Sequence, residues 1–337
     1  MAGNGSSTDA DVAVRPRLGA RLVRASRSPD THIRVRHTGS HPSMVDNLWT
    51  VPSKGSPATA VPLAVTVASR WRTAAPSSAV DLLFTILGEF VLPGDGTAWT
   101  SAVLAVLARL DVEEKAARQA LMRTASAGWL EGERIGRRAR WRLTAGARRM
   151  LTDGAERIYS FTGPAEDWDG RWLLVSARVP ENDRKGRRIL RSRLAWAGFG
   201  SLMPGLWISP HPERAAEAAQ VLEQASVADG AHIFTATHKG LADVLDMVAS
   251  VWDLVGIEES YREFIARFRS QLPGDALASQ VELVDAWRRF PSIDPALPRE
   301  LLPPHWTGLA AARLFAQRHQ RWEAGARHEW TLLNSAD

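Results

Sequence analysis

The 337-residue sequence contains no cysteine, which excludes disulfide bonds and thiolate-bound zinc. No apolar run approaches the ~20 residues that a membrane-spanning helix needs, and the first residues lack the charged-then-apolar pattern of a secretory signal. We therefore expect a cytoplasmic protein. Walker motifs, nucleophile elbows and clustered metal-ligand spacings are also missing, so we expect no enzyme, no metal and no bound cofactor.

Lysine is scarce as well. Only four of the 42 basic residues are lysine, which leaves 38 arginines. Together with the abundant alanine, this composition is typical of a GC-rich genome. The net charge of +5 therefore favours a polyanionic partner only weakly, because total charge says nothing about where the charges lie.

The length predicts two or three domains at about 150 residues each. Residues 1–76 contain few Leu, Ile and Phe and no sustained periodicity. We expect them to form a disordered tail, or to reflect a start assigned too early, with Met44 as a candidate internal start.

Residues 77–160 carry the pattern of a winged helix-turn-helix DNA-binding domain. Apolar residues at helical spacing predict three helices, the third running from about Glu113 to Ala127 and ending at Gly128. A β-hairpin with its tip at Ile135-Gly136 is expected next. Ser78 and Thr100 are expected to cap the first and second helices, and Thr144 a fourth helix that follows the hairpin. In a winged helix the third helix enters the major groove of DNA, and the hairpin, or wing, contacts the backbone.

A helical wheel divides the third helix into two faces. The face expected to pack inward consists of Ala117, Ala120, Leu121 and Thr124. The residues expected to contact DNA are Lys115, Arg118, Gln119 and Met122, with Arg123 beside them. Arginine suits guanine edges and glutamine suits adenine edges, so this face is predicted to read bases.

The wing is rich in arginine. Five arginines face only two glutamates in the segment from Glu131 to Arg142. The arginines are Arg134, Arg137, Arg138, Arg140 and Arg142, and all but the last are predicted to contact DNA. Such a cluster suits phosphate contacts, which supply affinity without reading sequence. A solvated hairpin enriched by the general arginine bias is the alternative interpretation.

Two further domains are expected, at 168–238 and 239–330. In the first, a buried strand at 172–179 and a helix at 183–196 precede two strands joined at Met203-Pro204-Gly205, a helix from Pro212 and a last strand at 231–235. This β-α-β-β-α-β order is ferredoxin-like. The second is expected to be helical, with its aromatic stripes forming core. The predicted fold class is α+β.

Seven separated phrases of the sequence resemble the PaaX family of phenylacetate-catabolism repressors. They are Ala117–Arg123, Gly128–Leu130, Arg134–Arg138, Trp168–Trp172, Leu194–Phe199, Gly205–Pro210 and Leu301–Gly308. The resemblance covers about residues 77–325. It implies a homodimeric repressor with an N-terminal winged helix, a Cas2-like middle domain and a helical C-terminal domain. It also implies double-stranded operator DNA as partner and an acyl-CoA effector such as phenylacetyl-CoA.

Basic residues on the helix at 183–196 are candidates to bind the phosphates of such an effector. They are Arg184, Lys185, Arg187, Arg188 and Arg191, with Arg193 following. A solvated face, a second DNA contact or a dimer contact are the alternatives. An apolar pocket for the acyl group is expected among Trp196, Trp207 and Trp252.

A metal-dependent, Cas2-like nuclease is the alternative function. Such an enzyme would place an Asp near the end of its first strand to hold Mg²⁺. The strand at 172–179 has no carboxylate before Glu181, which disfavours this interpretation.

Overall fold

The computed structural model describes residues 77–161, 168–180, 182–240, 243–270 and 274–335. The predictions for 1–76 therefore lie outside the described residues. The elements follow the order expected for an α+β chain, and the predicted fold class is confirmed. None of the described helices is long and apolar enough to cross a membrane.

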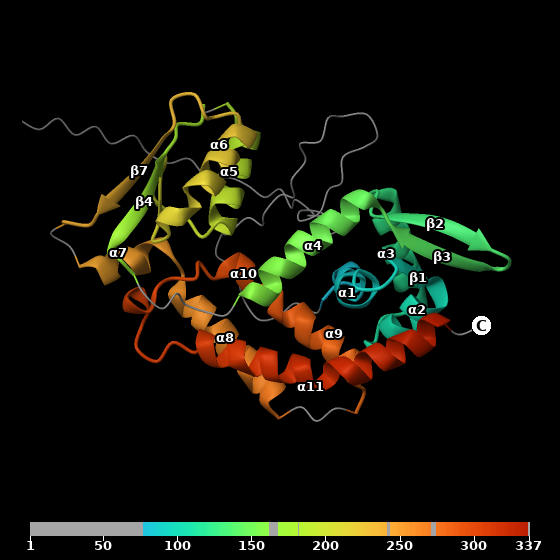
Figure 1. The fold of residues 1–337 in the computed structure, drawn as a ribbon. Helices are drawn as coiled ribbons and strands as arrows, with labels where there is room; N and C mark the ends of the chain where they lie inside the picture. The colour runs from blue at the N-terminus through green and yellow to red at the C-terminus, as the bar shows by residue number, and fades with distance from the viewer. Residues whose placement is uncertain (1–76, 162–167, 181, 241–242, 271–273, 336–337) are drawn as a thin grey trace, which may run out of the picture. The chain divides into compact units, whose positions relative to one another are not determined.

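The winged-helix region contains four α-helices, a short π-helix and a small sheet (Figure 1). Its elements are α1 (Ala79–Ile86), η2 (Leu87–Val91), β1 (Thr97–Trp99), α2 (Thr100–Arg109), α3 (Glu114–Ser126), β2 (Leu130–Ile135), β3 (Arg138–Leu143) and α4 (Ala145–Ser160). The sheet is antiparallel with the order β1-β3-β2. The predicted third helix and wing are thus present.

Local capping explains where these helices begin. Ser78 forms a full capping box with Asp81, and Thr144 accepts a hydrogen bond from the Ala147 amide, as predicted. The prediction for Thr100 was wrong, because Trp99 occupies the cap position. The Thr100 hydroxyl instead donates to the carbonyl of Ala139 on β3 and accepts from the indole N–H of Trp141 at 2.9 Å.

The middle region forms a four-stranded antiparallel sheet with the order β5-β6-β4-β7, as in ferredoxin-like folds. Its elements are β4 (Arg171–Ser176), α5 (Arg184–Trp196), β5 (Gly200–Met203), β6 (Leu206–Ser209), η3 (Pro212–Arg214), α6 (Ala215–Gln224) and β7 (His232–Thr237). Helices α5 and α6 pack against one face of the sheet (Figure 1).

Two predictions for this region were wrong in extent. The first strand ends at Ser176 rather than Val179, because only residues up to Ser176 pair with both β6 and β7. The helix expected from Pro212 begins at Ala215, after one 3₁₀ turn that starts at the proline.

The C-terminal region is helical, as predicted. Its elements are α7 (Val244–Val251), α8 (Leu254–Arg269), α9 (Ala276–Trp287), α10 (Phe290–Ile293), η4 (Arg299–Leu301) and α11 (Gly308–Ser335). Aromatic residues of α8, including Tyr261 and Phe264, are buried, as expected. Trp252 and Asp253 separate α7 from α8, and Val255, just after this break, is 81% exposed.

The hydrophobic core of the winged helix is completed by the C-terminal helices. Leu277 and Val281 of α9, and Ala326 and Trp330 of α11, belong to the same buried cluster as α1, α2 and α3. A second cluster joins Trp172 of β4 to the aromatic residues of α8 and α9. Helices α9 and α11 therefore contribute to the core on which the predicted DNA-contacting elements rest.

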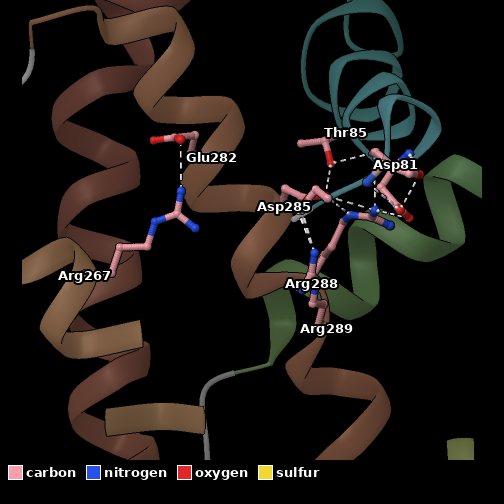
Figure 2. A network of polar contacts seen from close by, with 9 residues as sticks. Asp81, Thr85, Arg267, Glu282, Asp285, Arg288 and Arg289 are labelled. Carbon is pink, nitrogen blue, oxygen red and sulfur yellow. Dashed lines mark hydrogen bonds and ion pairs between the residues drawn. The ribbon is translucent and has the colours of Figure 1, made fainter. Parts of the chain in front are cut away.

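A buried polar network joins α1 to α9 (Figure 2). Arg288 bridges the carboxylates of Asp81 and Asp285 at 3.2 and 3.0 Å, and Arg289 contacts Asp285 at 3.2 Å. Thr85 donates to Asp285 at 3.3 Å. Burial alone would raise the pKa of Asp285, but the charges of the two arginines and the hydrogen bonds from Ser77 and Arg288 together outweigh it and lower the pKa.

Candidate DNA-contacting surface and ligand cavity

Helix α3 presents the two faces that its sequence predicts. The four residues expected to pack inward are buried. The residues expected to contact DNA are exposed and share one surface, formed by Glu114, Lys115, Arg118, Gln119, Met122 and Arg123. Met122, which is 57% exposed, is the apolar member of this surface.

Glu114 is a member of this surface that the sequence analysis missed. Its carboxylate accepts from Nε of Arg118 at 2.8 Å and lies 2.7 Å from the second guanidinium nitrogen. The spacing of four residues on a helix was the available signal. The contact orients the Arg118 guanidinium, although an exposed pair of this kind contributes little to stability.

The wing is a tight hairpin. Ile135 pairs with Arg138, so only Gly136 and Arg137 form the turn, one residue later than predicted. Gly136 has a φ of +61°, which a two-residue hairpin turn requires and glycine adopts without strain. Arg134 donates to the Gly136 carbonyl at 3.2 Å, and both Arg134 and Arg137 are exposed at the tip.

The remaining wing arginines lie on a single sheet face. The register places Glu133 opposite Arg140 and Glu131 opposite Arg142, so this face alternates charges. Arg140 contacts Glu133 at 2.8 Å, and the ion pair with Arg140 lowers the pKa of Glu133. Much of the predicted positive charge of the wing is therefore balanced within the hairpin, whereas the charge at its tip is not.

Trp99 of β1 supports the same face. The guanidinium carbon of Arg138 lies 4.0 Å from the centroid of its ring, and that of Arg140 lies 5.6 Å away. Arginine stacked on a tryptophan face is held by a cation–π attraction. Sequence analysis gave Trp99 no role, because β1 is only three residues long and joins the sheet through a long-range pairing.

The basic residues predicted on α5 are exposed along that helix. Arg184, Arg188 and Arg191 recur at spacings of four and three residues, so they share one side of α5. Arg191 lines a cavity, and the other predicted basic residues of α5 do not. Arg193, by contrast, is buried.

The cavity has a volume of about 230 Å³ and lies where α5, β5 and β6 meet α7, α8 and α10. Trp207 and Trp252 line it, as expected, together with Phe199, Ile257 and Ile293. Its polar side chains are Arg191, Ser201, Asp253, Ser260 and Ser292. Apolar walls with a few polar groups are typical of small-molecule sites.

Trp196 does not line this cavity, contrary to the prediction. Arg157 of α4 lies over its ring at 4.2 Å and donates to its backbone carbonyl. Burial lowers the pKa of Arg157 to about 10, although the nearby carboxylate of Glu217 opposes this. Trp196 therefore packs against α4, the helix that follows the wing, and helps to hold it in place.

Two carboxylates, Glu181 and Asp183, follow the first strand, where the nuclease alternative would need a metal ligand. Asp183 caps α5, where it accepts from the Gly186 amide at 2.7 Å, and Glu181 lies outside the described residues. The described residues contain no group of three or more His, Asp and Glu side chains that could hold a metal ion.

Three family models match the chain in the order of its structural regions. The model described as PaaX-like protein matches residues 78–147, the PaaX protein central Cas2-like domain matches 165–248, and the PaaX-like protein C-terminal domain matches 252–331. The transcriptional repressor PaaX of Escherichia coli (strain K12) is 32% identical over 262 residues, which are 74% of this chain and 81% of that protein.

The chain belongs to the PaaX-like family of transcriptional regulators. Among solved structures, the uncharacterized protein Rv0674 from Mycobacterium tuberculosis matches with a TM-score of 0.51 and 21% identity, covering 76% of this chain and 99% of that one. At 21% identity, this similarity shows a shared fold. In this PaaX-like regulator, the winged helix coincides with the first family match and the ferredoxin-like sheet with the Cas2-like match.

Proposed function

We propose that this PaaX-like regulator is a sequence-specific repressor that binds a palindromic operator as a homodimer and is released by an acyl-CoA effector. The observation that carries the DNA-binding part is the exposed face of α3, where arginine, glutamine and lysine surround an exposed methionine. The relative named as the transcriptional repressor PaaX supports repression.

We propose different tasks for helix and wing. Residues of α3, chiefly Arg118 and Gln119, would contact base edges, because a recognition helix lies in the major groove. Lys115 and Arg123 flank them. Arg134 and Arg137 at the wing tip, with Arg138 and Arg140 behind them, supply phosphate contacts, which raise the affinity for any sequence.

The effector part rests on the cavity and on the basic side of α5. We propose that the acyl group occupies the cavity between Trp207 and Trp252, and that Arg191 meets the polar part of the ligand. Arg184 and Arg188 lie on the same side of α5 as Arg191, and we propose that they bind the CoA phosphates outside the cavity. Lys185 and Arg187 add positive charge nearby. Release requires that the ligand bind the two states of the protein unequally.

Selection of genomic fragments by the purified full chain tests this function. The expected result is recovery of a few promoters that share a palindrome, from which candidate acyl-CoA thioesters then release the protein. Recovery of random fragments would contradict sequence-specific repression. Mg²⁺-dependent cleavage of the fragments would instead favour the nuclease alternative.

Arg191→Ala tests the effector site separately from DNA binding. The variant should need at least about tenfold more acyl-CoA for release, because a hydrogen bond to a charged group is lost. Its affinity for the operator without ligand should stay unchanged. Lys239→Ala removes an exposed positive charge outside the site and should release like the wild type. If the wild type, Arg191→Ala and Lys239→Ala are all released at the same acyl-CoA concentration, the effector does not bind through Arg191.

A further inference from the structure

The C-terminal end of α11 lies against the free edge of the wing sheet. The side-chain amide of Asn334 donates to the carbonyl of Thr97 at 3.2 Å, and its carbonyl oxygen accepts from the Trp99 amide at 2.8 Å. On its other edge β1 pairs with β3. One side chain thus satisfies the two backbone groups that a neighbouring strand would otherwise pair.

The last turns of α11 are anchored independently of Asn334. Trp330 is buried in the winged-helix core and stacks on Phe90 with ring centroids 5.7 Å apart. Glu329 forms an ion pair with Arg109 at the end of α2. Loss of the Asn334 side chain should therefore leave α11 in place and affect only the edge of β1.

Trp99 connects the hydrogen bonds made by Asn334 to the wing. Its amide is held by Asn334, while its ring carries the guanidinium of Arg138 at 4.0 Å. Arg140, opposite Trp99 in the register, is the second arginine near that ring and pairs with Glu133 across the hairpin. Two successive contacts therefore link the end of the chain to the wing arginines.

We propose that Asn334 is a positioning residue for the wing: it fixes β1 and Trp99, and thereby holds the arginine-bearing hairpin where it can contact phosphates. The proposal rests on the proposed DNA-binding function. It places a DNA-binding determinant some two hundred residues from the recognition helix, in a helix that carries no predicted DNA contact. Because the wing supplies affinity and α3 reads bases, Asn334 should influence how tightly the protein binds and leave the preferred sequence unchanged.

Three variants test the role of Asn334. Asn334→Ala removes both hydrogen bonds, and Asn334→Asp keeps an acceptor for the Trp99 amide but loses the donor to Thr97. Leu332→Ala is the matched control, because that side chain is 56% exposed on the same part of α11. Each full-length variant is compared with the wild type by amide hydrogen exchange, by DNA affinity at several salt concentrations, and by selection from random duplexes.

For Asn334→Ala we expect the Trp99 amide to exchange about tenfold faster, as loss of a hydrogen bond at an edge allows. The affinity for all duplexes should fall about fivefold to tenfold, and the slope of log affinity against log salt should decrease by about one. In Asn334→Asp the Trp99 amide should exchange more slowly than in Asn334→Ala, because a carboxylate oxygen still accepts from it. The affinity should fall at least as far, because the carboxylate has no donor for the Thr97 carbonyl and adds a negative charge beside the wing sheet. The selected sequence should be the same for every protein.

A wild-type affinity and salt slope in Asn334→Ala, despite fast exchange at Trp99, would overturn the positioning role. So would an altered preference at the bases read by α3, since that would indicate a general disturbance of the domain. Failure of the wild type itself to prefer any duplex would overturn the proposed function. The two failures are therefore distinguishable in one set of measurements.

Discussion

The guanidinium of Arg138 stacks on the ring of Trp99, with 4.0 Å between its carbon and the ring centroid. This contact divides the wing arginines into two groups. Arg138 and Arg140 are held against the sheet, whereas Arg134 and Arg137 are exposed at the tip. The two groups should respond differently to substitution, since loss of a held guanidinium also destabilises the hairpin, whereas loss of a tip guanidinium removes only its own contacts.

Arg137→Ala should weaken binding to all duplexes by a similar factor and reduce the salt slope by about one, because one phosphate contact is lost. Affinities measured over a range of salt concentrations, on a selected and a random duplex, check this. Arg313→Ala removes the same charge from an exposed position of α11 and serves as control. A slope change equal to that of Arg137→Ala in this control would show that net charge alone is responsible.

Arg118→Ala and Gln119→Ala should relax the base preference at individual positions by roughly 1–3 kcal/mol. The reason is that bidentate contacts with base edges discriminate between bases, unlike contacts with phosphates. Competition between the selected site and single-base variants of it gives the measurement. If these substitutions weaken all sequences equally, α3 is not the recognition helix. Ser126→Ala, at the exposed end of α3, should leave the preference unchanged.

The environment of Glu89 predicts that the free energy of unfolding depends on pH. Burial alone would raise its pKa, but hydrogen bonds and charge from His319, with hydrogen bonds from Tyr159 and Gln280, outweigh this and lower the pKa below its usual 4.5. The unfolded chain then binds the proton first as pH falls. The stabilisation by this carboxylate is therefore complete above about pH 4.5 and is lost as pH falls through the lower folded-state pKa.

Denaturant unfolding of the wild type and Glu89→Gln, at neutral pH and in steps below pH 4.5, tests this dependence. The wild type should be the more stable at neutral pH, and the difference should shrink as the acid concentration rises. Parallel curves for the two proteins would show that Glu89 does not titrate as described. Glu323→Gln alters an exposed ion pair and should change stability little at any pH.

Asp285→Ala should lower the free energy of unfolding by about 3–5 kcal/mol, because the part-buried Arg288 loses one of its two carboxylate partners and Arg289 loses its ion pair. The Asp285 side chain is only 4% exposed. Glu282→Ala provides a matched control on the same helix, since its ion pair with Arg267 is partly exposed and should contribute less than about 1 kcal/mol (Figure 2). Equal losses in urea unfolding would refute the role of the buried network.

The sequence predicted α3 and the wing well because both follow from local patterns. The helical spacing of Ala117, Ala120, Leu121 and Thr124 is enough to orient α3. The cavity was predicted in part, since Trp207 and Trp252 line it but Trp196 does not. Periodicity indicates that a tryptophan is buried, and it does not indicate against which element.

Long-range polar contacts could not be predicted at all. The ring nitrogen of His319 lies 2.8 Å from Glu89, which is 230 residues away in the sequence. Asn334 gave no signal, because an asparagine near a chain end is common and its partners Thr97 and Trp99 are known only from the fold. Such contacts depend on how α11 packs, and no local pattern encodes that packing.

The affinity of the purified protein for its selected duplex, measured in the presence of excess random DNA at physiological salt, tests the central claim most directly. Our account predicts binding at least about a thousandfold tighter than to the random duplex, with a palindromic preferred site. Weak binding that is the same for both duplexes and disappears at moderate salt would contradict it.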